Sequence, residues 1–226
     1  MKKNLLKTTL LSTLFLGAVQ FNQTFAQFDI ENLSFGAGIG TNSYAQGIGG
    51  SLAFNLRGHY MVSEKVAFTL GYNTQIPIKN TYEYTANAYS STTNPSSIDV
   101  NGEESISFHN IAADLHYYFV SDMEESFGLY GLVGLGLTFA GTETEFENYD
   151  KANYGFGTTT YGEAQTYTGF IINAGIGANF MISDQVSIFG EGRIGLPANK
   201  QDDQLIVNPI PFSYGLLAGV RFCPFN

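Results

Sequence analysis

Residues 127–139 read Phe-Gly-Leu-Tyr-Gly-Leu-Val-Gly-Leu-Gly-Leu-Thr-Phe, and every odd position in this stretch is apolar or glycine. Successive side chains of a β-strand point to opposite faces, so a row of this kind covers one whole face of a strand. The stretch therefore predicts a strand with one strongly apolar face.

Other alternating rows lie on both sides of this one. They are residues 33–40, 52–62, 66–75, 111–119, 172–182, 186–196 and 212–222, which gives eight predicted strands. One predicted strand changes phase. Its apolar residues Ile106 and Phe108 stand at even positions, whereas Ile111 and the apolar residues that follow it stand at odd positions. A period-2 row crosses such a slip only with an inserted residue, so we predict a β-bulge near His109 and Asn110.

A repeat marks the ends of three predicted strands. Each ends in two apolar residues, a serine and an acid: Met61-Val62-Ser63-Glu64, Phe119-Val120-Ser121-Asp122 and Met181-Ile182-Ser183-Asp184. The serines are 58 and 62 residues apart. That period fits two strands with one short turn and one long loop.

Short and long connections alternate along the chain. The short ones are residues 63–65, 121–126 and 183–185, and the longer ones are 41–49, 79–104, 142–164 and 197–208. This asymmetry predicts an all-β, closed, antiparallel, up-and-down transmembrane β-barrel of about eight strands, with short periplasmic turns and long extracellular loops. A soluble eight-stranded barrel or sandwich is the alternative, but its outer face would be polar and charged.

Composition favours the membrane barrel. Charged residues make up 13% of the chain, about half the usual share, and 26 of the 226 residues are glycine. No apolar run of 18 residues follows residue 26, which excludes a helical membrane protein. The single cysteine, Cys223, has no intrachain disulfide partner and is interpreted as an unpaired thiol of unknown role.

The first 26 residues have the order of a secretory signal peptide. Lys2, Lys3 and Lys7 precede an apolar run, and Thr24-Phe25-Ala26 supplies small residues at a cleavage site. The run is shorter than the ~20 residues that a helical anchor needs. Cleavage leaves a barrel domain over residues 27–226, whose seven basic and 20 acidic residues give a net charge of −13. Such a chain does not favour nucleic acid as a partner.

The alternating strands, the serine–acid turns and the segment Tyr214-Gly215-Leu216-Leu217-Ala218-Gly219-Val220-Arg221-Phe222 carry a resemblance. Over nearly all of residues 27–226 the chain resembles the outer-membrane β-barrel domain proteins common in Bacteroidetes, which are similar to small OmpX-like and OmpW-like eight-stranded barrels. The resemblance implies location in the outer membrane and recognition of the last strand by the barrel assembly machinery, although a tail from Cys223 to Asn226 follows that strand. It implies little about activity.

If the apolar rows face lipid, the intervening residues face the lumen. Seven of them are ionisable: Arg57, His59, Asp114, His116, Glu191, Arg193 and Arg221. The lumen of an eight-stranded barrel has room only for side chains, and buried charges are tolerated when they are paired. We therefore predict a lumen charge network that acts as a polar core, with a gate or proton path as the alternative.

Three further groups of residues are weaker candidates. His59, His116 and Asp114 are of metal-ligand type, but nothing fixes their spacing, so we predict no metal site. Residues 143–150 carry four acids without the spacing of a calcium loop, and a solvated acidic loop is the simpler interpretation. Tyrosines in the long connections favour either partner contact or an interfacial belt, namely Tyr82, Tyr84, Tyr89, Tyr149, Tyr154 and Tyr161.

Catalytic motifs are weak throughout the sequence. It contains no nucleophile elbow, no phosphate-binding glycine loop and no Ser-His pair at an enforced spacing. We expect no enzyme activity and no cofactor, and we predict a monomeric structural or surface-interaction protein whose partners are outer-membrane lipid and lipopolysaccharide. A narrow channel for small solutes and an outer-membrane lipid-modifying enzyme are the alternatives.

Overall fold

A computed structural model of the chain describes residues 29–45, 47–122, 127–156, 164–198 and 210–224. The predicted signal peptide, residues 1–26, lies outside the described residues, as does Tyr161. Within the described ranges, no helix has the length and apolar character needed to cross a membrane. The elements are η1 (Ile30–Asn32), β1 (Leu33–Tyr44), β2 (Gly49–Ser63), β3 (Val66–Gln75), β4 (Ile78–Ala88), β5 (Ser97–Asp122), β6 (Phe127–Phe146), β7 (Tyr154–Gly155), β8 (Gln165–Ser183), β9 (Val186–Pro197) and β10 (Ser213–Phe222).

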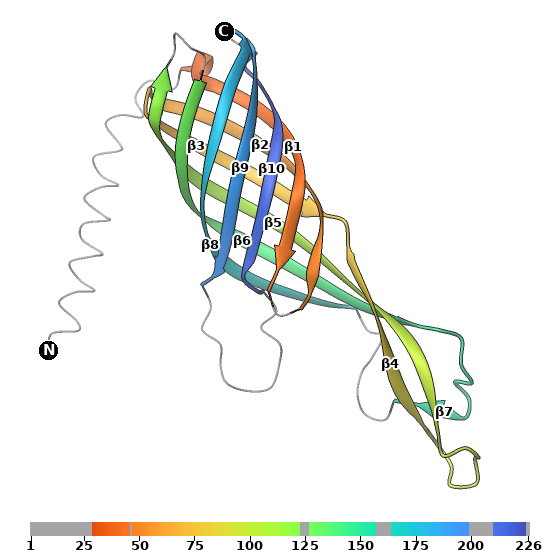
Figure 1. The fold of residues 1–226 in the computed structure, drawn as a ribbon. Helices are drawn as coiled ribbons and strands as arrows, with labels where there is room; N and C mark the ends of the chain where they lie inside the picture. The colour runs from red at the N-terminus through yellow and green to blue at the C-terminus, as the bar shows by residue number, and fades with distance from the viewer. Residues whose placement is uncertain (1–28, 46, 123–126, 157–163, 199–209, 225–226) are drawn as a thin grey trace, which may run out of the picture.

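Eight of these strands form a closed ring (Figure 1). The order β3-β2-β1-β10-β9-β8-β6-β5 is closed by pairing of β5 with β3, and every neighbouring pair is antiparallel. The ring follows chain order once β4 and β7 are set aside, so the topology is up-and-down. The predicted fold class is confirmed.

The apolar rows point outward, as the sequence predicts. On β6, Val133 and Leu135 are 54% and 65% exposed, while Tyr130 on the opposite face of the strand is fully buried in the lumen. At the end of the barrel that carries the short turns, exposed aromatic side chains form a girdle: Phe35, Phe68, Tyr117, Phe119, Phe127, Phe180 and Phe222. Aliphatic side chains cover the wall beyond this girdle. An apolar band edged by aromatic residues is the exterior of a membrane barrel.

The short turns and the chain end share one end of the barrel. Two residues separate β2 from β3 and two separate β8 from β9. The start of β1 lies beside the end of β10, because Phe35 pairs with Phe222 (Figure 1). This agrees with an even number of strands.

The predicted bulge near His109 and Asn110 is wrong. Pairing of β5 with both β3 and β6 runs through these residues without a shift. Register shifts instead lie between Met61 and Ser63, between Tyr118 and Val120, and between Met181 and Ser183. Each coincides with the apolar pair of the serine–acid repeat, so the repeat encodes a β-bulge at the entrance of each short turn.

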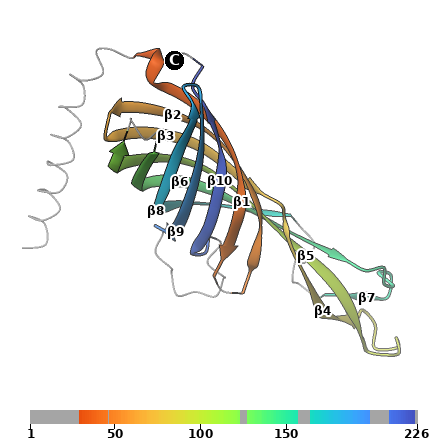
Figure 2. The ribbon, with the colours of Figure 1, turned by 45° about the horizontal axis from the view of Figure 1, so that its top comes forward.

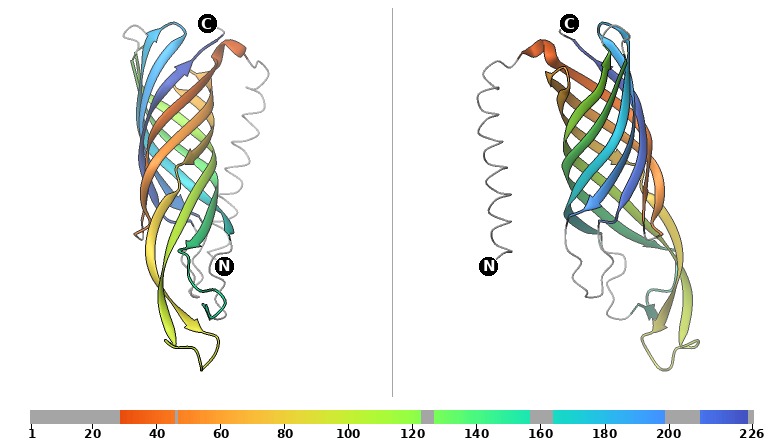
Figure 3. Two further views of the ribbon diagram at one scale, coloured as in Figure 1. Left: turned by 90° about the vertical axis from the view of Figure 1, so that its right-hand side faces the viewer. Right: turned by 60° about the vertical axis from the view of Figure 1, so that its left-hand side comes forward.

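The longest predicted loops are also corrected, because much of residues 79–104 and 142–164 is β-sheet. β4 pairs with the first part of β5, β6 continues beside β5 to Phe146, and β7 pairs with the end of β4. We call residues 78–106 and 141–156 the sheet extension. Figures 1–3 show it projecting from the end of the barrel opposite the short turns.

The sheet extension has a small core of its own. Ala86, Val100 and Tyr154 are buried in it, and Phe146 stacks on Phe156 with ring centroids 4.3 Å apart. On β5, Val100 belongs to the even face, the same face that carries buried Asp114 inside the barrel. The apolar residues therefore change face where the strand leaves the membrane wall, and this change explains the phase slip without a bulge.

Candidate functional site in the barrel lumen

The seven ionisable residues predicted for the lumen all point into it. They come from four strands: Arg57 and His59 from β2, Asp114 and His116 from β5, Glu191 and Arg193 from β9, and Arg221 from β10. Six are buried, and only Arg193 keeps 17% of its side-chain surface accessible. Alternation explains this placement, because each lies in the inward row of its strand.

Four of the seven form a continuous chain of opposite charges, which we call the charged core. Arg57 donates to both carboxylate oxygens of Glu191, with Nη1–Oε1 at 2.5 Å and Nη2–Oε2 at 3.1 Å. Arg193 donates from Nε to Glu191 Oε2 at 2.7 Å and from Nη1 to Asp114 Oδ2 at 2.8 Å. The two cations and two anions balance, and they tie β2, β9 and β5 together across the lumen.

Polar and aromatic neighbours complete the charged core. The Tyr130 hydroxyl donates to Glu191 Oε1 at 2.6 Å, and Asn173 Nδ2 donates to Asp114 Oδ1 at 3.3 Å. Arg57 donates from Nε to Asn55 Oδ1 at 2.5 Å, and its guanidinium lies 4.3 Å from the centroid of the Phe189 ring. These bonds offset the desolvation of the charges.

Sequence reasoning missed these partners. Tyr130, Phe189, Asn55 and Asn173 each belong to the inward row of a predicted strand, so the phase alone places them in the lumen. Writing out the inward rows in full, rather than only their charged members, would have found them.

Glycines make room for the aromatic members of the lumen. A Cβ on Gly177 would lie 2.6 Å from Tyr130 Cζ, and a Cβ on Gly219 would lie 2.5 Å from Phe189 Cζ. Both rings therefore lie directly over glycine backbone on a neighbouring part of the wall.

The other three predicted residues do not join the charged core. His59 shares a 2.8 Å hydrogen bond between Nδ1 and Thr69 Oγ1, and His116 stacks on Tyr130 with centroids 4.8 Å apart. In these three residues, the buried nitrogens without a hydrogen-bond partner are His59 Nε2, both ring nitrogens of His116, and Arg221 Nε and Nη2. Arg221 forms no ion pair with any described residue, and its guanidinium lies 5.7 Å from the Phe189 centroid.

A metal site is not assembled by these residues. The rings of His59 and His116 are near each other, with centroids 5.4 Å apart, but Asp114 is engaged by Arg193 and Asn173. Across the described ranges, no three His, Cys, Asp or Glu side chains are grouped so that they could hold a metal ion.

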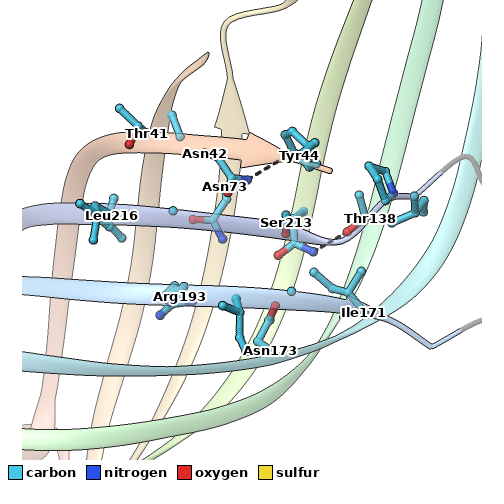
Figure 4. A pocket seen from close by; sticks show the side chains of 18 residues that line it. Thr41, Asn42, Tyr44, Asn73, Thr138, Ile171, Asn173, Arg193, Ser213 and Leu216 are labelled. Carbon is cyan, nitrogen blue, oxygen red and sulfur yellow. Dashed lines mark hydrogen bonds between the residues drawn. The ribbon is translucent and has the colours of Figure 1, made fainter. Parts of the chain in front are cut away.

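A cavity of about 90 Å³ lies on the sheet-extension side of the charged core, and we call it the lumen chamber (Figure 4). Its polar lining includes residues from seven barrel strands, namely Thr41, Asn42, Asn73, Asn110, Thr138, Asn173, Arg193 and Ser213. Figure 4 shows two hydrogen bonds in this lining, from Asn42 Nδ2 to the Tyr44 hydroxyl at 2.8 Å and from Asn110 Nδ2 to Thr138 Oγ1 at 2.8 Å.

An apolar cluster lies toward the sheet extension. Tyr44, Ile78, Phe108 and Ala140 form this aromatic lid, in which the Tyr44 and Phe108 rings stack with centroids 4.0 Å apart. The lumen is thus filled in layers: charged core, chamber, lid.

Among the described residues, the sheet extension carries most of the external charge. Its described residues include eight acids and two lysines: Glu83, Asp99, Glu103, Glu104, Glu143, Glu145, Glu147 and Asp150, with Lys79 and Lys151. The hydrogen bond from Lys79 Nζ to Glu103 Oε1, 2.6 Å long, raises the pKa of Lys79. Asp150 accepts from Asn153 Nδ2 at 2.6 Å, and this bond lowers the pKa of Asp150.

The comparisons with known proteins agree with this architecture. A family model described as outer membrane protein beta-barrel domain matches residues 8–209. The chain belongs to the outer membrane protein beta-barrel domain family. Membership in this family places the protein in the outer membrane.

Solved barrels of this kind resemble the chain in fold. Neisserial surface protein A is 17% identical, with a TM-score of 0.52 over 84% of this chain and 96% of the other. A major outer membrane protein from Thermus thermophilus is 10% identical, also with a TM-score of 0.52, over 84% and 98%. No curated protein sequence matches the chain. At these identities the similarity concerns the fold alone.

Proposed function

We propose that this outer-membrane barrel is a non-enzymatic surface-interaction protein, exported by the signal peptide of residues 1–26, and that the sheet extension is its binding surface. The observation that carries the proposal is the ordered core of the extension. Strands β5 and β6 run on past the barrel, where Val100 is buried and Phe146, partly buried, packs against the same cluster outside the membrane wall. A sheet with its own core presents side chains at fixed positions, as a recognition surface requires.

The chemistry of the extension favours a cationic protein partner. Its eight acids outnumber its two lysines, and Tyr82 and Tyr89 are 46% and 69% exposed beside them. Acidic surface attracts basic partners at long range, and exposed tyrosine supplies contact area with a polar end.

A charge-neutralising pair of variants tests this assignment. We expect Glu143→Gln/Glu145→Gln to weaken binding of a lysine-rich peptide to the purified protein by about threefold or more at low salt. The matched control, Glu31→Gln/Glu64→Gln, removes two exposed acids at the opposite end and should leave the affinity unchanged. Equal losses in both double variants would indicate a bulk charge effect and would refute the extension as the binding surface.

A narrow channel for small solutes is the first alternative to the surface-interaction function. The charged core leaves no orphan carboxylate, and it joins strands from both sides of the lumen. We therefore expect no stable single-channel conductance in planar bilayers. Reproducible ion currents from the intact protein would favour the channel instead.

An outer-membrane lipid-modifying enzyme is the second alternative. On the outer face, His109 Nδ1 lies 2.8 Å from the Tyr72 hydroxyl and 3.1 Å from Thr74 Oγ1. Tyr72 and the histidine ring are stacked, as interfacial belt residues often are. We propose a belt role, and expect the lipid A profile of a deletion strain to match the parent. A lipid A change that Thr74→Ala reproduces would establish catalysis.

The barrel wall suggests the other partners of the protein. We propose that the protein is a monomer in outer-membrane lipid and lipopolysaccharide, and that the assembly machinery engages β10. Every barrel strand already has two neighbours, so the described wall offers no open edge for a second copy. Light scattering of the detergent-solubilised protein should give the monomer mass, and a dimer mass would refute the monomer.

A further inference from the structure

We infer that the lumen chamber binds a small oxyanion, of the size of acetate or phosphate, and that Arg193 is its charged partner. This site is separate from the sheet extension. It is carried by the charge of the chamber, by its hydrogen-bond donors and by the space it encloses.

The charged side chain that lines the chamber is a cation. Arg193 lines it, whereas neither Asp114 nor Glu191 does, and the full lining includes no acid. Nε and Nη1 of Arg193 bond the two acids, which leaves Nη2 outside these bonds. Arg193, which keeps 17% of its side-chain surface accessible, is one of the residues that line the chamber.

The whole lumen has the same sign. Among its described residues, three arginines face two carboxylates, and both oxygens of each carboxylate already accept hydrogen bonds. One guanidinium is therefore in excess inside a wall that faces lipid. The arginine in excess is Arg221, which does not line the chamber; it makes the lumen as a whole favourable to an anion, while Arg193 is the cation at the site itself.

The neutral lining suits an oxyanion. Side-chain amides of Asn42, Asn73, Asn110 and Asn173 come from four different strands, and Thr138 and Ser213 add hydroxyls. Amide and hydroxyl groups donate to oxyanions from several directions, and an arginine can add a charge-assisted bond. A cavity of about 90 Å³ has space for several waters or for one such ion.

The walls of the site select for size. Arg193 of the charged core lines the chamber on one side, and Tyr44, whose ring stacks on Phe108, lines it on another. Ile210 and Pro211, both buried, add an apolar rim beside Ser213. The occupant must therefore be small and compact.

Titration calorimetry on the full-length mature protein in detergent tests the inference. The probes are sodium acetate, sodium phosphate and sodium sulfate, each titrated against a sodium chloride background of equal ionic strength. We expect at least one of the three to bind saturably. Heat-modifiable gel mobility should show first that each variant is folded.

The decisive variant is Asn73→Asp, which adds a carboxylate to the chamber and keeps the oxygen that accepts from Asn55 Nδ2 at 2.7 Å. Added negative charge should weaken oxyanion binding by about tenfold or more. Ser213→Asp, from a different strand of the same chamber, serves if Asn73→Asp does not fold. The matched control is Asn87→Asp, which makes the same charge change on the exposed strand β4 and should bind as the parent does.

Three results overturn the inference. They are no saturable heat with any of the three oxyanions, unchanged binding in the folded chamber variants, and an equal loss in Asn87→Asp. Loss of peptide binding at the extension, by contrast, has no bearing on the chamber.

Discussion

The lumen and the sheet extension bury opposite kinds of side chain on the same face of the same strand. Inside the barrel, the even face of β5 carries Asp114 and His116, and the odd face carries apolar residues toward lipid. Beyond the barrel, the even face carries Val100 in an apolar core, and the odd residue Asp99 is exposed. The strand continues through both regions without a break. The medium around it, lipid along the barrel wall and water around the extension, therefore decides which face is apolar.

β6 shows the same reversal. Val133 and Leu135 are exposed odd residues of the wall, and Glu143 and Glu145 are exposed odd residues of the extension. Phe146, an even residue, packs into the extension core. The outer boundary of the membrane therefore lies where the apolar row changes parity, between Phe108 and Ile111 on β5 and between Phe139 and Phe146 on β6.

The largest expected effect comes from breaking the charged core. Glu191→Ala leaves Arg57 and Arg193 without their shared carboxylate and Tyr130 without its acceptor, and uncompensated buried charge costs about 3–5 kcal/mol of unfolding free energy. Urea unfolding in phospholipid vesicles, followed by gel mobility and tyrosine fluorescence, measures it.

The control for this variant is Glu103→Ala on the extension. Glu103 pairs with Lys79 at 2.6 Å, but both side chains are well exposed, so its loss should leave the free energy of unfolding nearly unchanged. Similar costs for the two variants would mean that the core charges are hydrated after all.

A second comparison uses two residues on one face of β6. Leu135→Arg introduces a charge into the lipid-facing band and should cost about 2–4 kcal/mol of unfolding free energy. Glu145→Arg lies ten residues further along the same face, in the extension, and should leave the unfolding midpoint unchanged. If Glu145→Arg were the more damaging, the proposed membrane boundary would be misplaced.

A smaller effect is expected from Gly177→Ala. The added Cβ would lie 2.6 Å from Tyr130 Cζ, so the ring must move away from Glu191 and from its stack on His116. Overpacking of this kind costs about 1–3 kcal/mol. Gly190→Ala is the matched control, because the atom nearest to its new Cβ is 4.0 Å away, and the same unfolding assay should show no change.

The sequence was sufficient for the barrel because alternation is a local signal. Rows such as residues 127–139 show their lipid face without any knowledge of their neighbours, and the serine–acid repeat locates three short turns. The repeat also contains the three observed bulges. The parity change at Ile111, which predicts one bulge near His109 and Asn110, marks instead a change of the surrounding medium.

The extension and the pairing inside the lumen could not be predicted in this way. Residues 79–104 are polar enough to resemble a loop, and their few apolar side chains form a core only after β4, β5, β6 and β7 have paired. Alternation predicts that Arg57 and Arg221 face inward. It does not determine which of them reaches Glu191, because that depends on strand tilt and stagger around the ring.

The smallest expected effect concerns the edge of the extension. Asp150 accepts bonds from Asn153 Nδ2 and from the Ala152 amide, and its own carbonyl accepts from the Tyr154 amide at 3.0 Å, so its turn leads directly into β7. Because the bond from Asn153 lowers the pKa of Asp150, its stabilisation is complete above the ordinary value of 3.8 and is lost as the pH falls through the lowered value.

We expect Asp150→Asn to speed hydrogen exchange at the Tyr154 amide near neutral pH while global unfolding stays the same. Measured by NMR, the difference between parent and variant should shrink as the pH is taken below 3.8, since protonation then removes the charge that the variant lacks. A difference that persisted or grew in acid would mean that the charge of Asp150 does not hold β7 in place.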